Sequence, residues 1–374
     1  MSQPTRPDTS DPVWKLPAVP DDEGNYRIPF EDLRGLVVKL LTTVDVPPED
    51  AAIVAESLVL ADARGMNSHG VLRLPVYLKR LREGGFKPTS AFDVVSETPG
   101  TALIDGGSGL GSVLTKRAMD LAIEKARTNG IGAVGIRNSN HNGEGAFYVQ
   151  QAVAKDMIGI ATTNGSPIMP VWGGKTPLTG PLPISIGVPT ARHRPIVLDA
   201  ALGMSSRGKI LYYAEKGMEL PDGWLVDAEG RPTRDPNWVR NGGWILPVGG
   251  HKGWGLILAC EILSGILTGG AFGAELTNLY DDLDTPQRNG HFVIALNIAA
   301  FTDVASFKQR MDDYIDIMKA SELAPGFEQI FMPGEIEFLK KERQIAEGIL
   351  LGRKVLDEVI ATAKELGVEI DAAS

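Results

Sequence analysis

The sequence of 374 residues is poor in cysteine, histidine and aromatic side chains, with one cysteine, five histidines and 6% Phe, Trp and Tyr. A single cysteine, Cys260, excludes an intrachain disulfide and favours a reducing compartment. Its neighbourhood, GLILACEILSGIL, is typical of a small buried hydrophobe rather than a nucleophile. We therefore expect a cytoplasmic protein without a disulfide framework.

Excess positive charge and long uninterrupted apolar runs are also missing. The chain has 37 basic and 47 acidic residues and a net charge of -10. A surface of this sign repels phosphate backbones, so we expect no nucleic-acid partner. The most apolar stretch, residues 254–273, carries Glu261 near its centre, which favours a buried helix over a membrane span. We therefore expect no membrane partner.

The histidines lack the spacing of metal ligands. No H-x-x-x-H pair occurs, and no histidine has an acidic partner at ligand spacing. The sequence therefore predicts no metal site from the five positions His69, His141, His193, His251 and His291.

Apolar periodicity divides the chain into four segments. Residues 1–28 are rich in Pro and Asp and predict an extended arm, whereas residues 29–95 have apolar side chains at helical spacing. Residues 96–303 alternate short β-branched runs with helical segments, which is typical of an α/β domain with a mixed sheet. Residues 304–374 are mainly helical again, so we expect one helical domain built from both chain ends.

Two loops after predicted strands differ in what they offer. IDGGSGLGS, residues 104–112, has the spacing G-x-G-x-G instead of the dinucleotide fingerprint, which favours a tight turn feeding a helix. RNSNHNGEGAF, residues 137–147, carries His141 between a strand and a helix. Ligands of open α/β sheets bind at the carboxyl ends of strands, so His141 is a catalytic candidate; a loop histidine satisfied by backbone groups is the alternative.

GMNSHGVLRLP, residues 65–75, places Ser68 and His69 four to five residues before Arg73. On one helix face, the ring and the guanidinium could converge on a small carboxylate, with Tyr77 a further turn along. The alternative is that Arg73 bridges a helix end to a nearby acid.

Two further segments are suited to phosphate or ribose groups. PVGGHKGWG places His251 and Lys252 at the start of a helix, where free N–H groups and a lysine form an anion site. VLDAALG ends a predicted strand in small residues, where a ribose or phosphate could approach the backbone.

Together, six segments in order resemble the malate/L-lactate dehydrogenase family of the non-Rossmann type, from about residue 29 to about residue 365. The resemblance implies an α/β domain that binds NAD or NADP without the glycine fingerprint. It also implies a homodimer with active sites near the subunit interface. The segments are ADARGMNSHGVLRLPVYLKRL, NSNHNGEGAFYVQQAVAKDMIGIATTNGSPIMPVWGGKTPLTG, PIVLDAALGMSSRGK, KGMELPDGWLVDAEGRPTRDP, GGHKGWGLILACEILSGILTGGAFG and MPGEIE.

The resemblance further implies roles for single residues. His141 matches the family's proton acceptor or donor, His69 matches a second histidine with that role in some members, and Arg73 matches an arginine near the substrate carboxylate. Ser68 and Tyr77 complete the expected substrate-binding group. The expected cofactor contacts are Asn164, Gly165, Ser166, Asp199, Ala201, Leu202, Gly203, His251, Lys252, Gly334 and Glu335.

Three departures from the family pattern concern the walls of this site. Asn142 replaces a common aromatic and is followed by the acidic Glu144. The loop usually written LGTNP is TGPLP here, with Pro181 and Leu182, and DMATS is DAALG, residues 199–203. Because hydroxyl and amide groups are lost, the identity of the substrate does not transfer.

We therefore predict an NAD(P)-dependent oxidoreductase that moves a hydride between nicotinamide and C2 of a small 2-hydroxy or 2-oxo acid, resembling malate, lactate, sulfolactate or ureidoglycolate. One alternative is a reductase of a cyclic imine carboxylate. The other, from a different class, is a non-catalytic binding or scaffold protein that keeps the dimer.

Overall fold

The β-branched runs between residues 93 and 297 pair into one seven-stranded sheet in the structure, a computed structural model that describes residues 13–373. The strand order is β11-β10-β7-β15-β6-β5-β4, in which β5 and β6 are parallel and the other neighbours antiparallel. The predicted mixed sheet is confirmed. Its strands are β4 (Asp93–Glu97), β5 (Thr101–Asp105), β6 (Ile131–Ser139), β7 (Met157–Thr163), β10 (Pro183–Val188), β11 (Ile196–Ala201) and β15 (Asn289–Asn297).

Helices cover both faces of this sheet. Val134 and Ile136 of β6 are buried in the cluster that contains α4 (Gly111–Asn129) and α5 (Ala146–Val153). The intervening Gly135 faces Thr268 on the opposite side, where α7 (His251–Glu261) continues into the π-helical turn η4 (Ile262–Ile266). Side chains alternate between the two faces of a strand, so β6 is buried on both.

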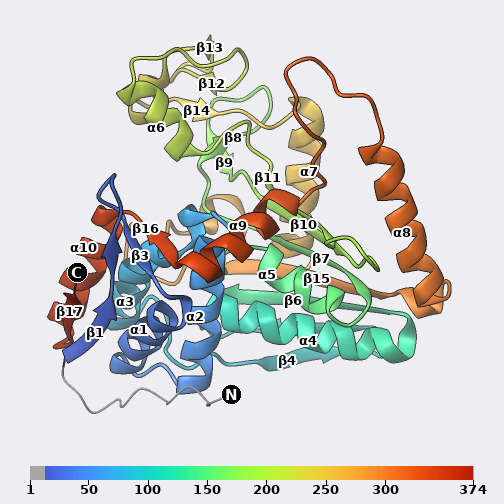
Figure 1. Ribbon diagram of the computed structural model, residues 1–374, viewed down its shortest axis with the longest axis horizontal. Coiled ribbons are helices and arrows are strands. Elements are labelled where there is room, and N and C mark those ends of the chain that lie inside the picture. The colour runs from blue at the N-terminus through green and yellow to red at the C-terminus, as the bar shows by residue number, and fades with distance from the viewer. Residues whose placement is uncertain (1–12, 374) are drawn as a thin grey trace.

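The two chain ends form the helical part, at the left of Figure 1. Its core is one apolar cluster built by α1 (Phe30–Thr43), α2 (Pro48–Ala63), α3 (Leu74–Glu83) and α10 (Arg353–Glu365). Strand pairing joins the ends: β1 (Val13–Pro17) lies parallel to β17 (Glu369–Ala373), and β3 (Tyr26–Ile28) pairs with both β16 (Ile349–Leu351) and β2 (Val19–Pro20). Residues 13–28 of the predicted arm are therefore strands or turns, and residues 1–12 lie outside the described residues.

A smaller lobe lies above the carboxyl end of β11, at the top of Figure 1. It has its own apolar cluster, which includes Ile210, Leu225 and Ile257. Its elements are β8 (Met169–Pro170), β9 (Pro177–Thr179), α6 (Arg207–Glu215), β12 (Leu225–Val226), β13 (Pro232–Thr233), the 3₁₀ turn η3 (Pro236–Arg240) and β14 (Trp244–Ile245).

The apolar stretch 254–273 differs from its prediction as a buried helix. One side of α7 and η4 packs on the sheet, but Leu256, Ile266 and Leu267 are 50%, 50% and 60% exposed. The segment is apolar on both sides, and only one side has a partner within residues 13–373. No helix in that range combines the length and apolar character needed to cross a membrane.

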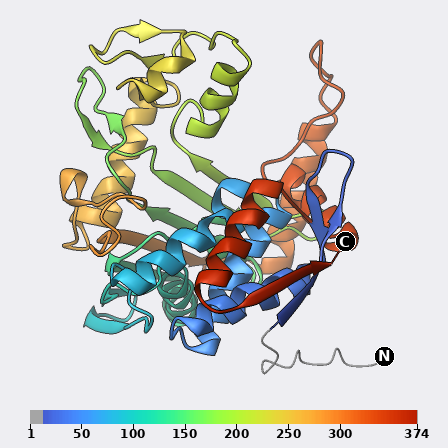
Figure 2. The ribbon, with the colours of Figure 1, turned by 90° about the vertical axis from the view of Figure 1, so that its left-hand side faces the viewer.

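Two helices lie between the last strand of the sheet and the C-terminal elements of the helical part. Helix α8 (Val304–Lys319) stands apart from the sheet at the right of Figure 1, and it lies at the back in Figure 2, where the helical part faces the viewer. Helix α9 (Glu335–Glu347) returns across the sheet towards α2 and β16. Gly334, before α9, has φ 86°, and a Cβ there would lie 2.8 Å from the carbonyl oxygen of Val197. This glycine therefore lets the start of α9 lie directly against β11.

Candidate active site

His141 lies in the loop between β6 and α5, at the carboxyl end of the strand as predicted. The loop packs against the first turn of α4. A Cβ on Gly111 of that turn would lie 2.0 Å from the carbonyl oxygen of Asn140, so only a glycine permits this approach. The Asn140 amide donates to the carbonyls of Ser108 and Gly109 at 2.7 and 2.9 Å. The glycine-rich stretch 104–112 is thus a tight turn that feeds a helix and supports the His141 loop.

His69 and Arg73 occupy two consecutive 3₁₀ turns, η1 (Asn67–His69) and η2 (Val71–Arg73), between α2 and α3. The buried Asp62 at the end of α2 anchors both turns, because its carboxylate accepts from the Val71 N–H at 2.7 Å and the Asn67 amide at 3.1 Å. A Cβ on Gly70 would lie 2.1 Å from this carboxylate, so Gly70 permits the close approach. Burial raises the pKa of Asp62 to about 7.

The two segments bring the predicted catalytic residues together. The rings of His69 and His141 stack with centroids 5.6 Å apart and an interplanar angle of 16°. The Tyr77 hydroxyl lies 2.5 Å from Nδ1 of His141, and the Ser68 hydroxyl lies 2.9 Å from Nδ1 of His69. The structure thus assembles side chains from α3, the 3₁₀ turns and the β6–α5 loop.

The expected common helix face of His69 and Arg73 is wrong. Gly70 between them is extended, with φ -86° and ψ -153°, so the two residues belong to separate turns. The alternative that Arg73 bridges to an acid is also wrong: its Nε donates to the Ser68 carbonyl at 2.7 Å, and its Nη1 donates to the hydroxyl of Tyr280. No hydrogen bond within residues 13–373 occupies Nη2 of Arg73.

Both histidines are neutral near pH 7. Burial, with a smaller contribution from the Arg73 charge, lowers the pKa of His69 to about 4. Burial, followed by the charges of Arg73, His69 and His291, holds the pKa of His141 well below its ordinary value of 6.5. A substrate carboxylate that neutralised Arg73 would relieve part of this depression.

The contacts of His141 also fix its tautomer. The Gly143 N–H points at Nδ1 from 3.4 Å, and a backbone N–H can only donate. Nδ1 is therefore an acceptor, with Tyr77 as its second donor, and the proton of the neutral ring lies on Nε2. No protein group within residues 13–373 is hydrogen-bonded to Nε2, so it is the nitrogen open to a ligand. The alternative of a ring satisfied by the backbone is therefore not what the structure contains.

The unusual residues after His141 face inward. The Asn142 amide donates to the Thr115 hydroxyl of α4 at 3.2 Å, and its carbonyl accepts from the Tyr148 hydroxyl. Glu144 forms an ion pair with Arg64 at 2.6 Å, and both side chains are 3% exposed. Burial raises the pKa of Glu144 to about 7 despite Arg64. These departures therefore join the loop to α4 and to the end of α2, and leave the exposed side of His141 unchanged.

Three contributing residues were missed by the sequence analysis. The side-chain oxygen of Gln287 accepts from the His141 N–H at 2.9 Å, and Tyr280 contacts Arg73 through its hydroxyl and its ring. His291 of β15 lies 2.8 Å from the Ser139 hydroxyl and so holds the end of β6. Local sequence gives no signal for the first two, since both lie in the loop 276–288 far along the chain.

The predicted cofactor residues form two groups around β7, β11 and α7. An isolated bridge between Gly203 and Pro247 brings the end of β11 beside the glycines that precede His251 and Lys252. Asn164, after β7, is buried and donates to Glu261 of α7 at 3.2 Å, and the Ser166 hydroxyl donates to the Thr277 carbonyl at 3.1 Å. Gly165 lies between them, and Ala201 and Leu202 continue β11 towards the bridge.

Two predicted cofactor carboxylates already have protein partners. Asp199 accepts from the Ala146 N–H, which starts α5, at 2.8 Å and from the Ser185 hydroxyl at 2.7 Å. Glu335 forms an ion pair with Lys319 at 2.7 Å and accepts from the Met332 N–H. Both carboxylates therefore hold elements in place, and a ribose hydroxyl would have to share them.

The start of α7 fits a diphosphate. Gly249 and Gly250 have φ 62° and 66°, and a Cβ on Gly250 would lie 3.1 Å from the Trp172 indole. The first turn of the helix has free N–H groups, and both His251 and Lys252 are exposed beside it. The altered loop residues lie nearby, because the Pro181 ring would be 3.1 Å from a Cβ on Gly203, and Leu182 is buried in the lobe.

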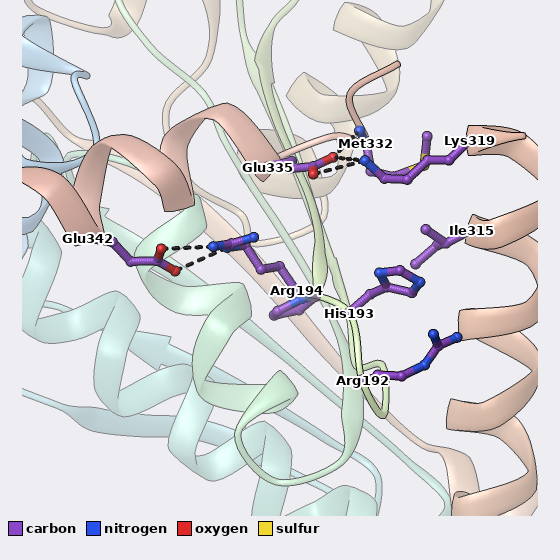
Figure 3. A pocket seen from close by; sticks show the side chains of 9 residues that line it. Arg192, His193, Arg194, Ile315, Lys319, Met332, Glu335 and Glu342 are labelled. Atoms are coloured by element: carbon purple, nitrogen blue, oxygen red, sulfur yellow. Dashed lines mark hydrogen bonds and ion pairs between the residues drawn. The ribbon is translucent and has the colours of Figure 1, made fainter. Parts of the chain in front are cut away.

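Two hollows of about 370 and 390 Å³ have neither His69 nor His141 in their lining. The first is lined by the β10–β11 turn, α8 and α9, and Figure 3 shows that Arg194 faces Glu342 while Lys319 faces Glu335. Arg192 and His193 are paired with Asp316. Since its cations are neutralised in this way, this hollow is not a preformed anion site. Within residues 13–373, no group of three or more His, Cys, Asp or Glu side chains is placed to hold a metal ion.

Comparison with known proteins gives a consistent result. The family model described as "Malate/L-lactate dehydrogenase" matches residues 28–360. The malate dehydrogenase of Pyrococcus abyssi is 42% identical, with 93% of this chain and 97% of the relative aligned. The ureidoglycolate dehydrogenase (NAD(+)) of Escherichia coli K12 is 33% identical over 90% of this chain and 96% of its own. The (2R)-3-sulfolactate dehydrogenase (NADP(+)) of Chromohalobacter salexigens is 32% identical over 90% and 98%.

Solved structures agree with this result over the whole fold. Sulfolactate dehydrogenase from Methanocaldococcus jannaschii superposes with a TM-score of 0.87 at 38% identity, covering 91% of this chain and 97% of that one. A delta1-piperideine-2-carboxylate reductase from Pseudomonas syringae superposes with a TM-score of 0.80 at 28% identity, covering 90% and 99%.

Proposed function

Because the chain belongs to the malate/L-lactate dehydrogenase family, we propose that it interconverts a small 2-hydroxy acid and its 2-oxo acid by reversible hydride transfer at C2. It is an oxidoreductase that uses NAD or NADP, as the names of its relatives indicate. The observation that carries the proposal is the free Nε2 of His141: within residues 13–373 the ring is hydrogen-bonded through Nδ1 alone, and it is stacked with the His69 ring. When bound, the nicotinamide supplies or accepts the hydride.

Arg73 would hold the substrate carboxylate. Its Nε and Nη1 are used to fix the guanidinium on Ser68 and Tyr280, so the remaining N–H groups point away from both partners. A charge-assisted hydrogen bond to a carboxylate contributes about 1.5–3 kcal/mol. Ser68 acts through its carbonyl on Arg73 and its hydroxyl on His69.

His141 would exchange the proton at the C2 oxygen. In the reductive direction, the ring would first take up a solvent proton at Nδ1, where Tyr77 then accepts, and would give its Nε2 proton to the C2 oxygen, so that the ring ends neutral. Oxidation of the alcohol would reverse these steps. The bound carboxylate raises the pKa of His141 by neutralising Arg73, which brings the ring closer to operating pH. The His69 ring is nearly parallel to the His141 ring, with centroids 5.6 Å apart, and would limit its rotation.

The cofactor would lie between α7 and the carboxyl end of β11. Lys252 and the first N–H groups of α7 suit its diphosphate, and the small residues Ala201 and Gly203 leave room for backbone contact. Gly165 and Gly334 similarly leave the adjoining backbone accessible.

A second candidate reaction is reduction of a cyclic imine carboxylate. The structural similarity to delta1-piperideine-2-carboxylate reductase favours it, since the same arginine and histidine could serve a C=N bond. A non-catalytic scaffold, the third expectation, is not supported by the family membership or by the assembled histidine site.

The proposal includes a homodimer. Unpartnered apolar side chains on α7 and η4, among them Leu256, Ile266 and Leu267, are suited to a subunit interface. Sedimentation equilibrium at micromolar concentration tests this part of the proposal, and a monomer would contradict it. The cytoplasmic location stays a prediction, based on the single Cys260.

The experiment that tests the activity follows NADH and NADPH absorbance with a panel of 2-oxo acids and cyclic imine carboxylates. Turnover of a 2-oxo acid supports the dehydrogenase, and turnover of imines alone selects the reductase. Absence of turnover together with absence of NADH or NADPH binding by calorimetry would overturn both.

A further inference from the structure

Arg80 of α3 is a fully enclosed cation with an unusual set of partners. Its side chain is 0% exposed, and its guanidinium donates to backbone carbonyls of the loop between residues 276 and 288. Nε donates to Leu279 at 2.7 Å, Nη1 to Thr285 at 2.8 Å, and Nη2 to Asp281 at 2.7 Å and to Asn278. One side chain thus fixes the backbone of the loop at four points.

The enclosure of Arg80 is stabilised by the loop itself. The carboxylates of Asp281, Asp282 and Asp284 act on the guanidinium through their charge, opposing the effect of its burial. The Arg80 guanidinium also lies over the Phe86 ring, 5.5 Å from its centroid. A buried guanidinium is costly unless its donors are satisfied, and here they are satisfied by the loop 276–288.

This loop delivers two side chains to the active site. Tyr280 places its ring 5.4 Å from the Arg73 guanidinium carbon and its hydroxyl on Nη1. Gln287 accepts from the His141 N–H at 2.9 Å, and its own N–H donates to Asn140 at 3.0 Å. The two contacts reach the group that would bind the carboxylate and the group that would move the proton.

Tyr280 has little other structural use. Its side chain is 55% exposed, and its ring is absent from the apolar core clusters of residues 13–373. The hydroxyl of Tyr280 contacts Nη1 of Arg73, and the guanidinium carbon lies 5.4 Å from the ring centroid, so Tyr280 restricts where the guanidinium can lie. Arg73 itself has no carboxylate partner within residues 13–373.

From this geometry we propose that Tyr280 is a positioning residue for substrate recognition, which orients Arg73, and that Arg80 positions Tyr280 by clamping the loop 276–288. This inference rests on the proposed function, because it assigns Arg73 to a substrate carboxylate. Tyr280 acts on binding of the acid, whereas cofactor binding and the proton transfer at His141 do not depend on it.

The test is steady-state kinetics of Tyr280→Phe with oxaloacetate, the 2-oxo partner of malate, and with pyruvate. Loss of one hydrogen bond to the guanidinium should raise KM about fivefold, with kcat changed less than about twofold. Tyr280→Ala, which also removes the ring, should raise KM further. Tyr212→Phe is the matched control, because Tyr212 is 53% exposed and also lies under a cation, Lys216, but belongs to α6. Equal KM values in Tyr280→Phe and wild type would overturn the inference.

A double-mutant cycle separates positioning from general stability. If Tyr280 acts through Arg73, Tyr280→Phe should have no further effect on KM in an Arg73→Met background. An undiminished effect in that background would contradict the mechanism. Arg80→Lys cannot reach four carbonyls; its melting temperature should fall, and where it stays folded, its KM should rise as in Tyr280→Ala.

Binding of oxamate, an unreactive amide analogue of a 2-oxo acid, distinguishes this inference from the proposed function. Calorimetry on the wild-type enzyme with NADH or NADPH should show binding that Tyr280→Ala weakens about tenfold or more. Wild-type protein that neither binds oxamate nor turns over any acid would overturn the proposed function and this inference together. Wild-type activity with unaltered Tyr280 variants would overturn this inference alone.

Discussion

Two histidines, the half-buried His141 in the β6–α5 loop and the fully buried His291 in β15, differ in their partners. Burial lowers the pKa of both rings, that of His291 to about 3. Both nitrogens of His291 are used, by the Thr163 hydroxyl at 2.7 Å and the Ser139 hydroxyl at 2.8 Å. His141 uses Nδ1 alone. A desolvated ring with a shifted pKa is therefore not in itself a sign of catalysis; an unfilled nitrogen beside a cation is the better criterion.

The two histidines are also connected through the end of β6. His291 follows a register shift between β15 and β6, and it holds Ser139, two residues before His141. Asn289 and Gly290, at the same shift, contact Asn164 at the predicted cofactor side. His291 thus fixes the carboxyl end of β6, the strand that leads into the His141 loop.

The largest effect is expected when His141 itself is substituted. His141→Ala should lower kcat by roughly 10²- to 10⁴-fold, the usual contribution of a general acid or base, and leave the melting temperature nearly unchanged. Steady-state kinetics with NADH or NADPH measures the effect. His193→Ala is the control, because His193 is hydrogen-bonded to Asp316 at 2.8 Å, outside both regions. Unchanged kcat in His141→Ala would move the proton-transfer role to His69.

Removal of the cation beside His141 is the next largest change. Arg73→Met should raise KM for the acid by roughly 10- to 100-fold, since a charge-assisted hydrogen bond is lost. It should also raise the pKa of His69 and His141, because the positive charge that opposes their protonation is gone. The imidazole ¹⁵N shifts across a pH titration measure this. His291 should titrate as in wild type, and a parallel shift there would mean that the fold had changed.

The sequence predicted the surroundings of His141 better than those of His291. The strand, polar loop and helix around His141 follow from β-branched runs and glycine punctuation, and so do the strands β5, β6, β7, β10, β11 and β15. Spacing suggested that His69 and Arg73 share a helix face, but Gly70 and the carboxylate of Asp62 divide the segment into two turns. A four-residue spacing indicates neighbours only while the helix continues.

Contacts across long stretches of chain could not be predicted. Tyr280 is 207 residues from Arg73, and Gln287 is 146 residues from His141. The β-branched run HFVIALNI, residues 291–298, predicts a strand, but it does not reveal that His291 contacts Ser139 and Thr163. The helix of residues 251–266 was predicted, whereas its exposed apolar side was not. The apolar pattern of a helix does not show which of its faces are buried against other elements.

The pH dependence of the free energy of unfolding reports on His291. Its pKa is about 3 in the folded state and about 6.5 when unfolded, so the unfolded chain binds more protons between these values. Wild-type stability due to this ring therefore falls as pH decreases through this window. Between pH 6.5 and 5, wild type should lose about 2 kcal/mol more stability than His291→Gln.

Urea unfolding of both proteins at the two pH values measures this difference. Asp62 and Glu144, whose pKa values are raised to about 7, act in the opposite direction, because their folded forms bind protons over the same range. Comparison with His291→Gln cancels their contributions. Parallel pH dependence of the two proteins would show that His291 is protonated in the folded state.

A smaller effect is expected at the predicted cofactor side. Lys252 is exposed at the first turn of α7, so Lys252→Ala should weaken NADH or NADPH binding about fivefold without changing the KM for the acid much. Nicotinamide fluorescence titration measures the dissociation constant. Lys155→Ala is the control, since Lys155 is an exposed lysine just beyond α5. Unaltered affinity in Lys252→Ala would remove this lysine from the diphosphate site.

A similarly small effect is predicted for Tyr77, whose hydroxyl contacts Nδ1 of His141. Tyr77→Phe removes one donor to Nδ1 of His141, while the Gly143 N–H still points at that atom. The neutral tautomer with Nε2–H should therefore persist, and kcat should fall only about three- to tenfold, through looser orientation of the ring and loss of an acceptor for its charged form. Imidazole ¹⁵N chemical shifts report the tautomer directly. If Tyr77→Phe instead moved the proton to Nδ1, the backbone of the loop would not be sufficient to fix the tautomer. The orientation of His141 would then depend on α3, as the orientation of His291 depends on the hydroxyls of Thr163 and Ser139.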